Sequence, residues 1–201
     1  FFNHCANTSR LHNQYDHMFK CHCSFLGSNL PRKRPIFKKI FPFLKNKDFK
    51  LLGQGWTNKD KILSFFQKVG DYKNINFLKN IKIKKIDFDD EKKIYSSSKI
   101  NLNIHNDYEH FYGGPINERF FSIAACKGFQ ISDKIDQISN NFKEGHDVVT
   151  WVNTDDFIDK YEYYLKNYDL ALNIAKNQYK KIIQNYTYDI VIKNLLEYCN
   201  Y

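Results

Sequence analysis

The sequence lacks the features that mark several common classes of protein. It has four prolines and eight glycines in 201 residues, with no low-complexity linker and no internal repeat. No apolar run approaches the roughly 18 residues that a membrane-spanning helix needs. The five cysteines show neither a disulfide-scaffold spacing nor the paired spacing of a zinc knuckle. We therefore expect a cytoplasmic protein with reduced thiols, no metal ion and no cofactor.

Motifs of two binding classes are also missing. No G-x-G-x-x-G follows the first predicted strand, which argues against a dinucleotide-dependent oxidoreductase. Neither an RNP-like motif nor a clustered basic helix is present, so we expect no nucleic acid partner. No Ser-His-Asp arrangement and no pair of carboxylates can be identified, so the catalytic residues stay unknown at this point.

What the sequence does hold is positive charge and apolar residues. The net charge is +9, with 42% hydrophobic and 17% aromatic residues. This composition predicts a packed core and excludes global disorder. The positive balance suits a phosphorylated ligand or peripheral contact with a membrane. Lys, Asn, Ile, Phe and Tyr are all abundant, as is typical of proteins from AT-rich genomes. Genome composition is therefore an alternative explanation of the positive charge, and it stays open.

Alternating strand and helix patterns predict one α/β domain. We expect strands at 21–26, 49–52, 75–88, 99–105, 129–131 and 147–152, and helices at 36–44, 57–66, 89–98, 118–127, 154–165, 168–186 and 187–198. A glycine-bearing turn after each of the first two strands indicates a doubly wound parallel sheet, Rossmann-like, with helices at its C-terminus. Pro42 should kink or shorten the first helix.

The start of the chain differs from this pattern. Residues 1–20 are polar and irregular, and the chain begins with Phe rather than Met. We expect a fragment or a processed product, in which 1–20 is a linker or the remnant of an upstream domain. The domain itself is expected to span 21–201.

A phosphate-binding site is predicted within residues 99–133. Gly113 and Gly114 break the chain after a strand, and Asn117 can cap the helix that follows. Arg119 lies in the first turn of that helix. Free N–H groups and the helix dipole favour an anion there, and the guanidinium fork matches a phosphate.

Five short motifs, each present once, follow one another along most of the chain. They are FLGS at 25–28 with Pro31 and Arg34, LLGQGW at 51–56, SKINLN at 98–103, NERFF at 117–121 with AAC at 124–126, and DVV at 147–149. No single motif is specific, but the ordered set resembles the C-terminal half of GT-B glycosyltransferases. The greatest likeness is to the group-1-type domain of the spore-maturation (CgeB-like) family.

The resemblance implies a function for the chain. It would be the donor-binding half of a glycosyltransferase that uses a UDP-, GDP- or similar sugar, in cell-surface polysaccharide biosynthesis. The unknown acceptor would bind an upstream domain. GT-B enzymes usually need no metal, because backbone amides and basic side chains stabilise the diphosphate leaving group.

The resemblance also suggests substrate-binding residues. They are Gly27, Ser28, Arg34, Gly53, Gly55, His105, Gly113, Gly114, Asn117, Glu118, Arg119 and Ser122. Arg34 is expected to reach the phosphates, with Arg32 and Lys38 as near substitutes. Trp56 either flanks the base or lies in the core.

Two alternatives concern the predicted helix at 118–127. Arg119 can instead form an ion pair with Glu118 or Asp133. Ser122 stands where the family often has a glutamate that binds the ribose, and a serine cannot form that charge-assisted bond. Glu118, four residues earlier on the same helical face, can substitute for it. A non-catalytic domain of the same fold, acting in binding or as a scaffold, is therefore the alternative to an enzyme.

Overall fold

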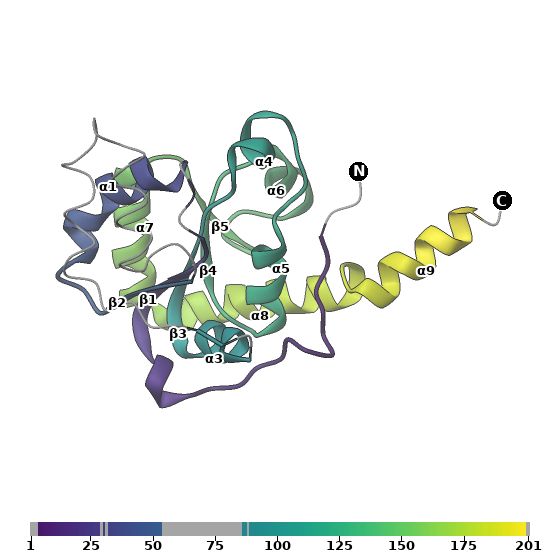
Figure 1. Ribbon diagram of the computed structural model, residues 1–201, viewed down its shortest axis with the longest axis horizontal. Coiled ribbons are helices and arrows are strands. Elements are labelled where there is room, and N and C mark those ends of the chain that lie inside the picture. Colours follow the sequence, from purple (N-terminus) through teal and green to yellow (C-terminus); the bar gives the residue numbers. More distant parts are fainter. Residues whose placement is uncertain (1–3, 29, 31, 54–85, 88, 200–201) are drawn as a thin grey trace.

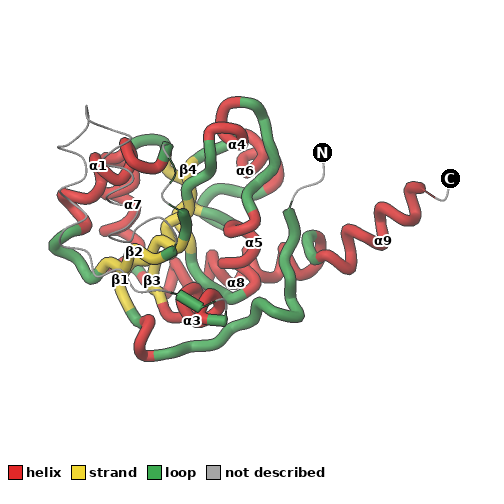
Figure 2. The backbone as a smooth tube through the Cα atoms, in the orientation of Figure 1, coloured by secondary structure: helices red, strands yellow, loops and turns green. Residues whose placement is uncertain are grey.

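The computed structural model describes residues 4–28, 30, 32–53, 86–87 and 89–199. Within this part of the chain, one parallel sheet has the strand order β2-β1-β3-β4-β5. The strands are β1 (Cys21–Leu26), β2 (Phe49–Leu52), β3 (Ser98–Asn103), β4 (Gln130–Asp133) and β5 (Val149–Trp151). Figures 1 and 2 show helices on both sides of this sheet. The predicted doubly wound α/β fold is confirmed.

The helices follow the order that the sequence predicts. They are η1 (His17–Phe19), α1 (Lys33–Leu44), α3 (Asp90–Ser97), α4 (Asp107–Phe111), α5 (Glu118–Ala125), α6 (Asp136–Asn141), α7 (Thr154–Lys166), α8 (Tyr168–Asn185) and α9 (Tyr188–Cys199). Pro42 lies inside α1, which ends two residues later at Leu44. The short helices η1 and α4 were not expected. The expected helix at 57–66 and nearly all of the expected strand at 75–88 lie outside the described residues.

The strand order contains a switch point. β1 pairs with β2 on one side and with β3 on the other. The chain therefore leaves β1 in one direction and later returns to its other side. In open parallel sheets of this kind, ligands bind outside the carboxyl ends of the strands at the switch point. The loops after Leu26 and Asn103 are consequently the place to look for a site.

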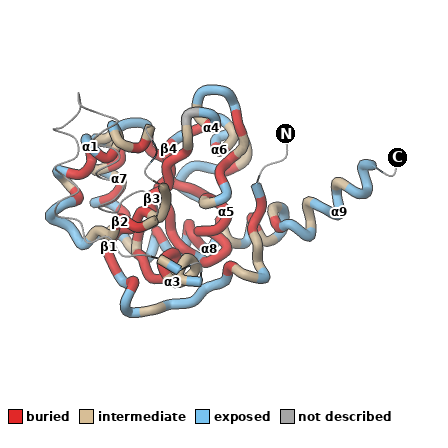
Figure 3. The backbone as a smooth tube through the Cα atoms, viewed as in Figure 1, coloured by how far each residue is buried: buried red, intermediate tan, exposed pale blue. Residues whose placement is uncertain are grey.

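The two faces of the sheet are buried in different ways. On one face, apolar strand residues such as Phe25 and Leu102 pack against α1 and α7. On the other, the strands present polar side chains to α3 and α5, and these are buried as well. They include Asn101, Asn103 and Gln130. Figure 3 shows the strands as buried along most of their length. Buried polar groups must be hydrogen-bonded, and this requirement shapes the second face.

Helix α9 differs from the rest. None of its residues is buried, and it extends away from the body of the domain in Figures 1 and 3. No helix among the described residues is both long and apolar enough to span a bilayer.

The buried polar face leads to a test of stability at Asn101. Its side chain donates to the carbonyls of Tyr95 and Phe129, each at 3.1 Å, and accepts from the Ser24 hydroxyl at 3.2 Å. Asn101→Leu would leave these partners buried and unsatisfied. We expect a loss of about 3 kcal/mol in the free energy of unfolding, measured by urea denaturation. Asn185→Leu, at an exposed site of α8, is the control and should change it by less than about 0.5 kcal/mol. Equal losses in the two variants would contradict this view of Asn101.

Candidate active site

Two glycines bring the ends of β1 and β2 together. The N–H of Gly27 donates to the carbonyl of Leu52 at 3.0 Å. Gly53 has a φ of +117°, and a Cβ there would lie 2.6 Å from the Gly27 oxygen. A Cβ on Gly27 would lie 2.5 Å from Nη2 of Arg119. Glycine at position 27 therefore lets the guanidinium of α5 lie directly against the end of β1.

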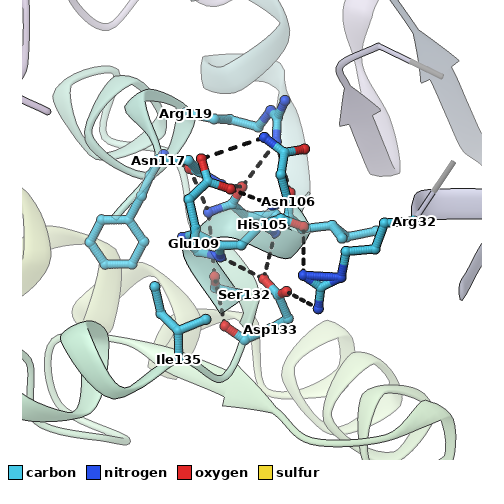
Figure 4. Close-up of polar contacts among 12 residues, drawn as sticks. Arg32, His105, Asn106, Glu109, Asn117, Arg119, Ser132, Asp133 and Ile135 are labelled. Atoms are coloured by element: carbon cyan, nitrogen blue, oxygen red, sulfur yellow. Dashed lines mark hydrogen bonds and ion pairs between the residues drawn. The ribbon is translucent and has the colours of Figure 1, made fainter. Parts of the chain in front are cut away.

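Arg119 is held in place by the end of β3. Its Nη1 donates to Oδ1 of Asn103 at 3.2 Å and to the carbonyl of Ile104 at 3.4 Å. Asn117 caps α5 by accepting from the N–H of Phe120 at 3.0 Å, as the sequence predicted. The same cap exchanges amide hydrogen bonds with Asn103, at 3.1 and 3.2 Å. Figure 4 shows Asn117 and Arg119 in a close-up of the polar contacts around this site.

Arg119 has a second cation for a neighbour. The Phe25 ring lies 5.1 Å from the Arg119 guanidinium carbon and 5.6 Å from Nζ of Lys33. Lys33 begins α1 and is only 2% exposed. Burial, and secondarily the charge of Arg119, lower the pKa of Lys33 to about 8. Within the described part of the chain, neither cation forms an ion pair with a carboxylate. The expected alternative, an ion pair of Arg119 with Glu118 or Asp133, is not found there.

A cavity of about 520 Å³ lies beside Arg119, at the switch point. We call it the switch-point cavity. It brings together many of the residues that the sequence singled out, namely Gly27, Ser28, Gly53, Asn117, Glu118, Arg119 and Ser122. The hydroxyl of Ser122 is buried and has no hydrogen-bond partner among the residues that the structure describes. Glu118 lies on the exposed rim of the same cavity.

Several residues of this cavity were missed from the sequence. Glu91 and Tyr95 reach it from α3, and Glu91 forms an ion pair with Arg10 at 2.7 Å. Asn106 and Glu109 reach it from the start of α4, where the Glu109 carboxylate accepts from the N–H of Asn106. The sequence pointed to Arg34 and not to Lys33, whose Nζ lies 5.6 Å from the centre of the Phe25 ring. No local pattern marks these positions, because only the packing of α1, α3 and α4 brings them to the switch point.

Other predicted residues lie elsewhere. Arg34, His105, Gly113 and Gly114 line neither this cavity nor the larger one described below. Gly114 instead packs against α4, since a Cβ there would lie 2.8 Å from the Tyr108 ring. Gly55 and Trp56 lie outside the described residues.

His105 is fully buried in a polar cluster behind the cavity. Its Nδ1 lies 2.6 Å from Oδ1 of Asp133, at the end of β4. Arg32 completes the cluster, because its Nη1 donates to the His105 carbonyl at 3.1 Å and its Nη2 lies 3.6 Å from Oδ2 of Asp133 (Figure 4). The cluster joins the ends of β3 and β4 to the start of α1.

A second, larger cavity of about 980 Å³ opens at the ends of β4 and β5. We call it the edge cavity. Its lining includes Arg32, Asp133, Trp151 and His110, and it shares no lining residue with the switch-point cavity. Helix α4 contributes to both, with Glu109 in one wall and His110 in the other. The two cavities are therefore neighbours across one short helix.

Known proteins with a similar sequence or fold can now be compared with this site. A family model described as glycosyl transferase-like matches residues 32–197. No curated protein sequence matches the chain.

Solved structures share the fold at low sequence identity. Sucrose-phosphate synthase from Thermosynechococcus elongatus has a TM-score of 0.69 at 10% identity, over 98% of this chain and 51% of that one. HepE from Anabaena, in complex with UDP-glucose, has a TM-score of 0.66 at 9% identity, over 90% and 49% of the two chains. The C-terminal domain of the group 1 glycosyltransferase LpcC from Francisella tularensis has 0.60 at 13% identity, over 91% and 99%.

The chain thus spans about half the length of the first two proteins and nearly all of the isolated C-terminal domain. The predicted fold class, a Rossmann-like domain of the GT-B type, is confirmed by these likenesses. Because the family model spans most of the sequence, the chain belongs to the glycosyl transferase-like family.

Proposed function

We propose that this chain is the donor-binding half of a glycosyltransferase that transfers a sugar from a nucleotide-diphosphate sugar to an acceptor. One observation supports the proposal above all. Lys33 and Arg119 each lie against the Phe25 ring near the switch point, and neither pairs with a carboxylate among the described residues. A diphosphate is the ligand that fits two such cations.

Other cationic side chains of the protein, in contrast, form ion pairs with carboxylates. Arg10 pairs with Glu91 at 2.7 Å, and Lys181 pairs with Asp147 at 2.8 Å. Placing a nearly buried ammonium beside a guanidinium costs free energy, as the lowered pKa of Lys33 shows. A bound anion would recover that cost. The arrangement is therefore suited to ligand binding and poorly suited to stabilising the free protein.

The same arrangement can assist glycosyl transfer. When the bond between the anomeric carbon and the diphosphate oxygen breaks, the electron pair leaves with the diphosphate. Negative charge then grows on the oxygens next to Lys33 and Arg119. Donors that are already in position stabilise that charge without reorganising. We assign no catalytic base to a described residue.

The remaining predicted residues complete the proposal. Gly27, Ser28 and Gly53 would let the backbone approach the diphosphate, while Glu118 and Ser122 would face the ribose. Roles for Arg34, Gly55, His105, Gly113 and Gly114 stay predictions.

The finer assignments are also proposals. They are membership of the CgeB-like subfamily, hexosyl transfer without a metal ion, and a UDP- or GDP-sugar as the donor. They extend to an acceptor-binding domain upstream, a cytoplasmic location with peripheral membrane contact, and a role in cell-surface polysaccharide biosynthesis.

A second candidate function is a binding or scaffold domain without catalysis. The buried hydroxyl of Ser122, which has no partner in the described part of the chain, favours it, because a serine there cannot replace a glutamate as a charged partner of the ribose. Ser122→Glu separates the two candidates. A gain in affinity for UDP or GDP would indicate a weakened enzyme, and no gain would favour the binding domain.

The first test of the donor site removes its cations one at a time. UDP or GDP at 100 times its Kd should raise the free energy of unfolding of the wild-type protein by about 2.7 kcal/mol. Lys33→Met and Arg119→Met should each weaken nucleotide binding about 10- to 100-fold, because each loses a charge-assisted contact with the diphosphate. Isothermal titration calorimetry measures these affinities.

Lys45→Met is the matched control for Lys33→Met. It removes the same charge from an exposed position at the end of α1 and should leave the affinity unchanged. Wild-type affinity in both site variants, or no binding of either nucleotide to the wild-type protein, would overturn the proposed function.

A second test uses the lowered pKa of Lys33. In the free protein this pKa is about 8, so above that pH most Lys33 side chains are neutral. A bound diphosphate favours the charged form and raises the pKa. Between the two values the complex holds more protons than the free protein, so binding takes up protons and weakens as the pH rises. Calorimetry in buffers with different ionisation enthalpies measures this uptake. We expect it to be absent from Lys33→Met, and equal uptake in both proteins would rule out Lys33 as its source.

A further inference from the structure

One wall of the switch-point cavity is formed by α3 and by residues 4–20, which we call the leading segment. Arg10 and Glu91 both line the cavity, and Nη1 of Arg10 lies 2.7 Å from Oε2 of Glu91. Their side chains are 22% and 20% exposed, so a ligand in the cavity can reach both. This ion pair therefore presents N–H donors beside carboxylate acceptors.

The leading segment is fixed on both sides of Arg10. The N–H of Ala6 donates to the carbonyl of Tyr186 at 2.8 Å, and the side chain of Asn13 donates to the carbonyl of Cys126 at 3.1 Å. Figure 1 shows this segment, in purple, running past α3 to the start of β1. Because the segment is already held by the domain, a ligand can bind the pair without ordering a loop.

The charges that line the cavity separate the two ends of a nucleotide. Arg119 supplies positive charge beside the end of β1, where the proposed diphosphate binds. Asp87 and Glu91 supply carboxylates on the side of α3, and these repel a second anion. Tyr95 is near both sides, because its pKa, raised mainly by burial, is raised further by the charge of Glu91 and lowered by that of Arg119. A neutral part of the nucleotide, its base, therefore suits the side of α3.

The pattern of donors and acceptors distinguishes between the bases. Guanine has two adjacent N–H donors, at N1 and N2, beside the carbonyl acceptor O6. It can donate twice to a carboxylate while it accepts from an arginine. Uracil, cytosine and adenine each donate only once to a carboxylate at the corresponding edge. An arginine and a glutamate side by side thus match guanine at all three positions.

We propose that the donor is a guanosine-diphosphate sugar, whose base is bound by Glu91 and Arg10. This inference rests on the proposed function, because the base reaches α3 when the diphosphate binds beside Arg119. HepE, which is solved with UDP-glucose, is only 9% identical to this chain, so the two proteins share a fold and need not share a base. The leading segment, which the sequence predicted to be a linker or a remnant, is then part of the donor site.

Three nucleoside diphosphates test the inference in the wild-type protein. IDP differs from GDP only in lacking the N2 amino group, and UDP has a single N–H at the edge of its base. We expect IDP to bind about tenfold more weakly than GDP, because one hydrogen bond to a charged group is lost. UDP should bind at least about tenfold more weakly than GDP for the same reason. Isothermal titration calorimetry under one set of buffer conditions measures all three affinities.

Glu91→Gln tests the carboxylate. The amide keeps the size of the side chain but has one acceptor oxygen and no charge. GDP should bind about tenfold more weakly, and its affinity should come within about twofold of that of IDP. Glu162→Gln is the matched control, because it removes a carboxylate that pairs with Lys47 at 3.5 Å and lines neither cavity. It should keep the wild-type ratio. If Glu91→Gln does not fold, the three nucleotides still decide the inference in the wild-type protein.

Arg10→Met tests the donor of the pair. GDP and IDP carry the same O6, so both should bind about tenfold more weakly and the ratio of their affinities should persist. Lys20→Met removes an exposed cation from the same segment and should leave both affinities unchanged. Equal affinities in Arg10→Met and Lys20→Met would contradict the role of Arg10.

The outcomes separate this inference from the proposed function. A protein that binds nucleotides, but binds GDP no more tightly than IDP or UDP, overturns the guanine assignment alone. An unchanged ratio of the GDP and IDP affinities in Glu91→Gln also overturns it. Failure of both GDP and UDP to bind would overturn the proposed function, and the guanine assignment with it.

Discussion

The buried amide of Asn103 is the interaction on which the rest of the site depends. Its nitrogen donates to Asn117 at 3.2 Å and to the Ser132 hydroxyl at 3.3 Å. Its oxygen accepts from Asn117 at 3.1 Å and from Arg119 at 3.2 Å. One side chain thus joins β3 to β4, fixes the cap of α5 and orients the guanidinium. Because Asn103 is wholly buried, each of these bonds is expensive to lose, and the group holds one geometry.

This constraint explains why the sheet has a polar face that is nevertheless buried. Asn101 donates to the backbone carbonyl of Tyr95 in α3, and Gln130 donates to that of Phe120 in α5. An apolar face could pack against the same helices but would lose these directional contacts. The polar residues therefore set the position of α5 along the sheet, and with it the position of Arg119 relative to the end of β1.

Much of the fold could be predicted from the sequence because its signals are local. The alternation in residues 99–105, the cap at Asn117 and the glycine-bearing turns after residues 26 and 52 each depend on neighbouring residues only. The site depends on distant ones. Lys33 and Lys38 look alike in the sequence, and only the packing of α1 buries the first and exposes the second. His105 was expected to contact a ligand, yet its carboxylate partner lies 28 residues away. No local pattern records that pairing.

The two cavities differ in whether their charged side chains are paired with an opposite charge, and this difference affects which ligands each can bind. At the switch point, Lys33 and Arg119 remain without carboxylate partners in the described part of the chain, and an anion is the missing group. At the edge, Arg32 already compensates Asp133, so a second anion would be repelled by the carboxylate and an additional cation has no unpaired charge to meet. The two cavities at one edge of the sheet therefore differ in charge, because Arg32 compensates the carboxylate at one and no described carboxylate pairs with the cations at the other.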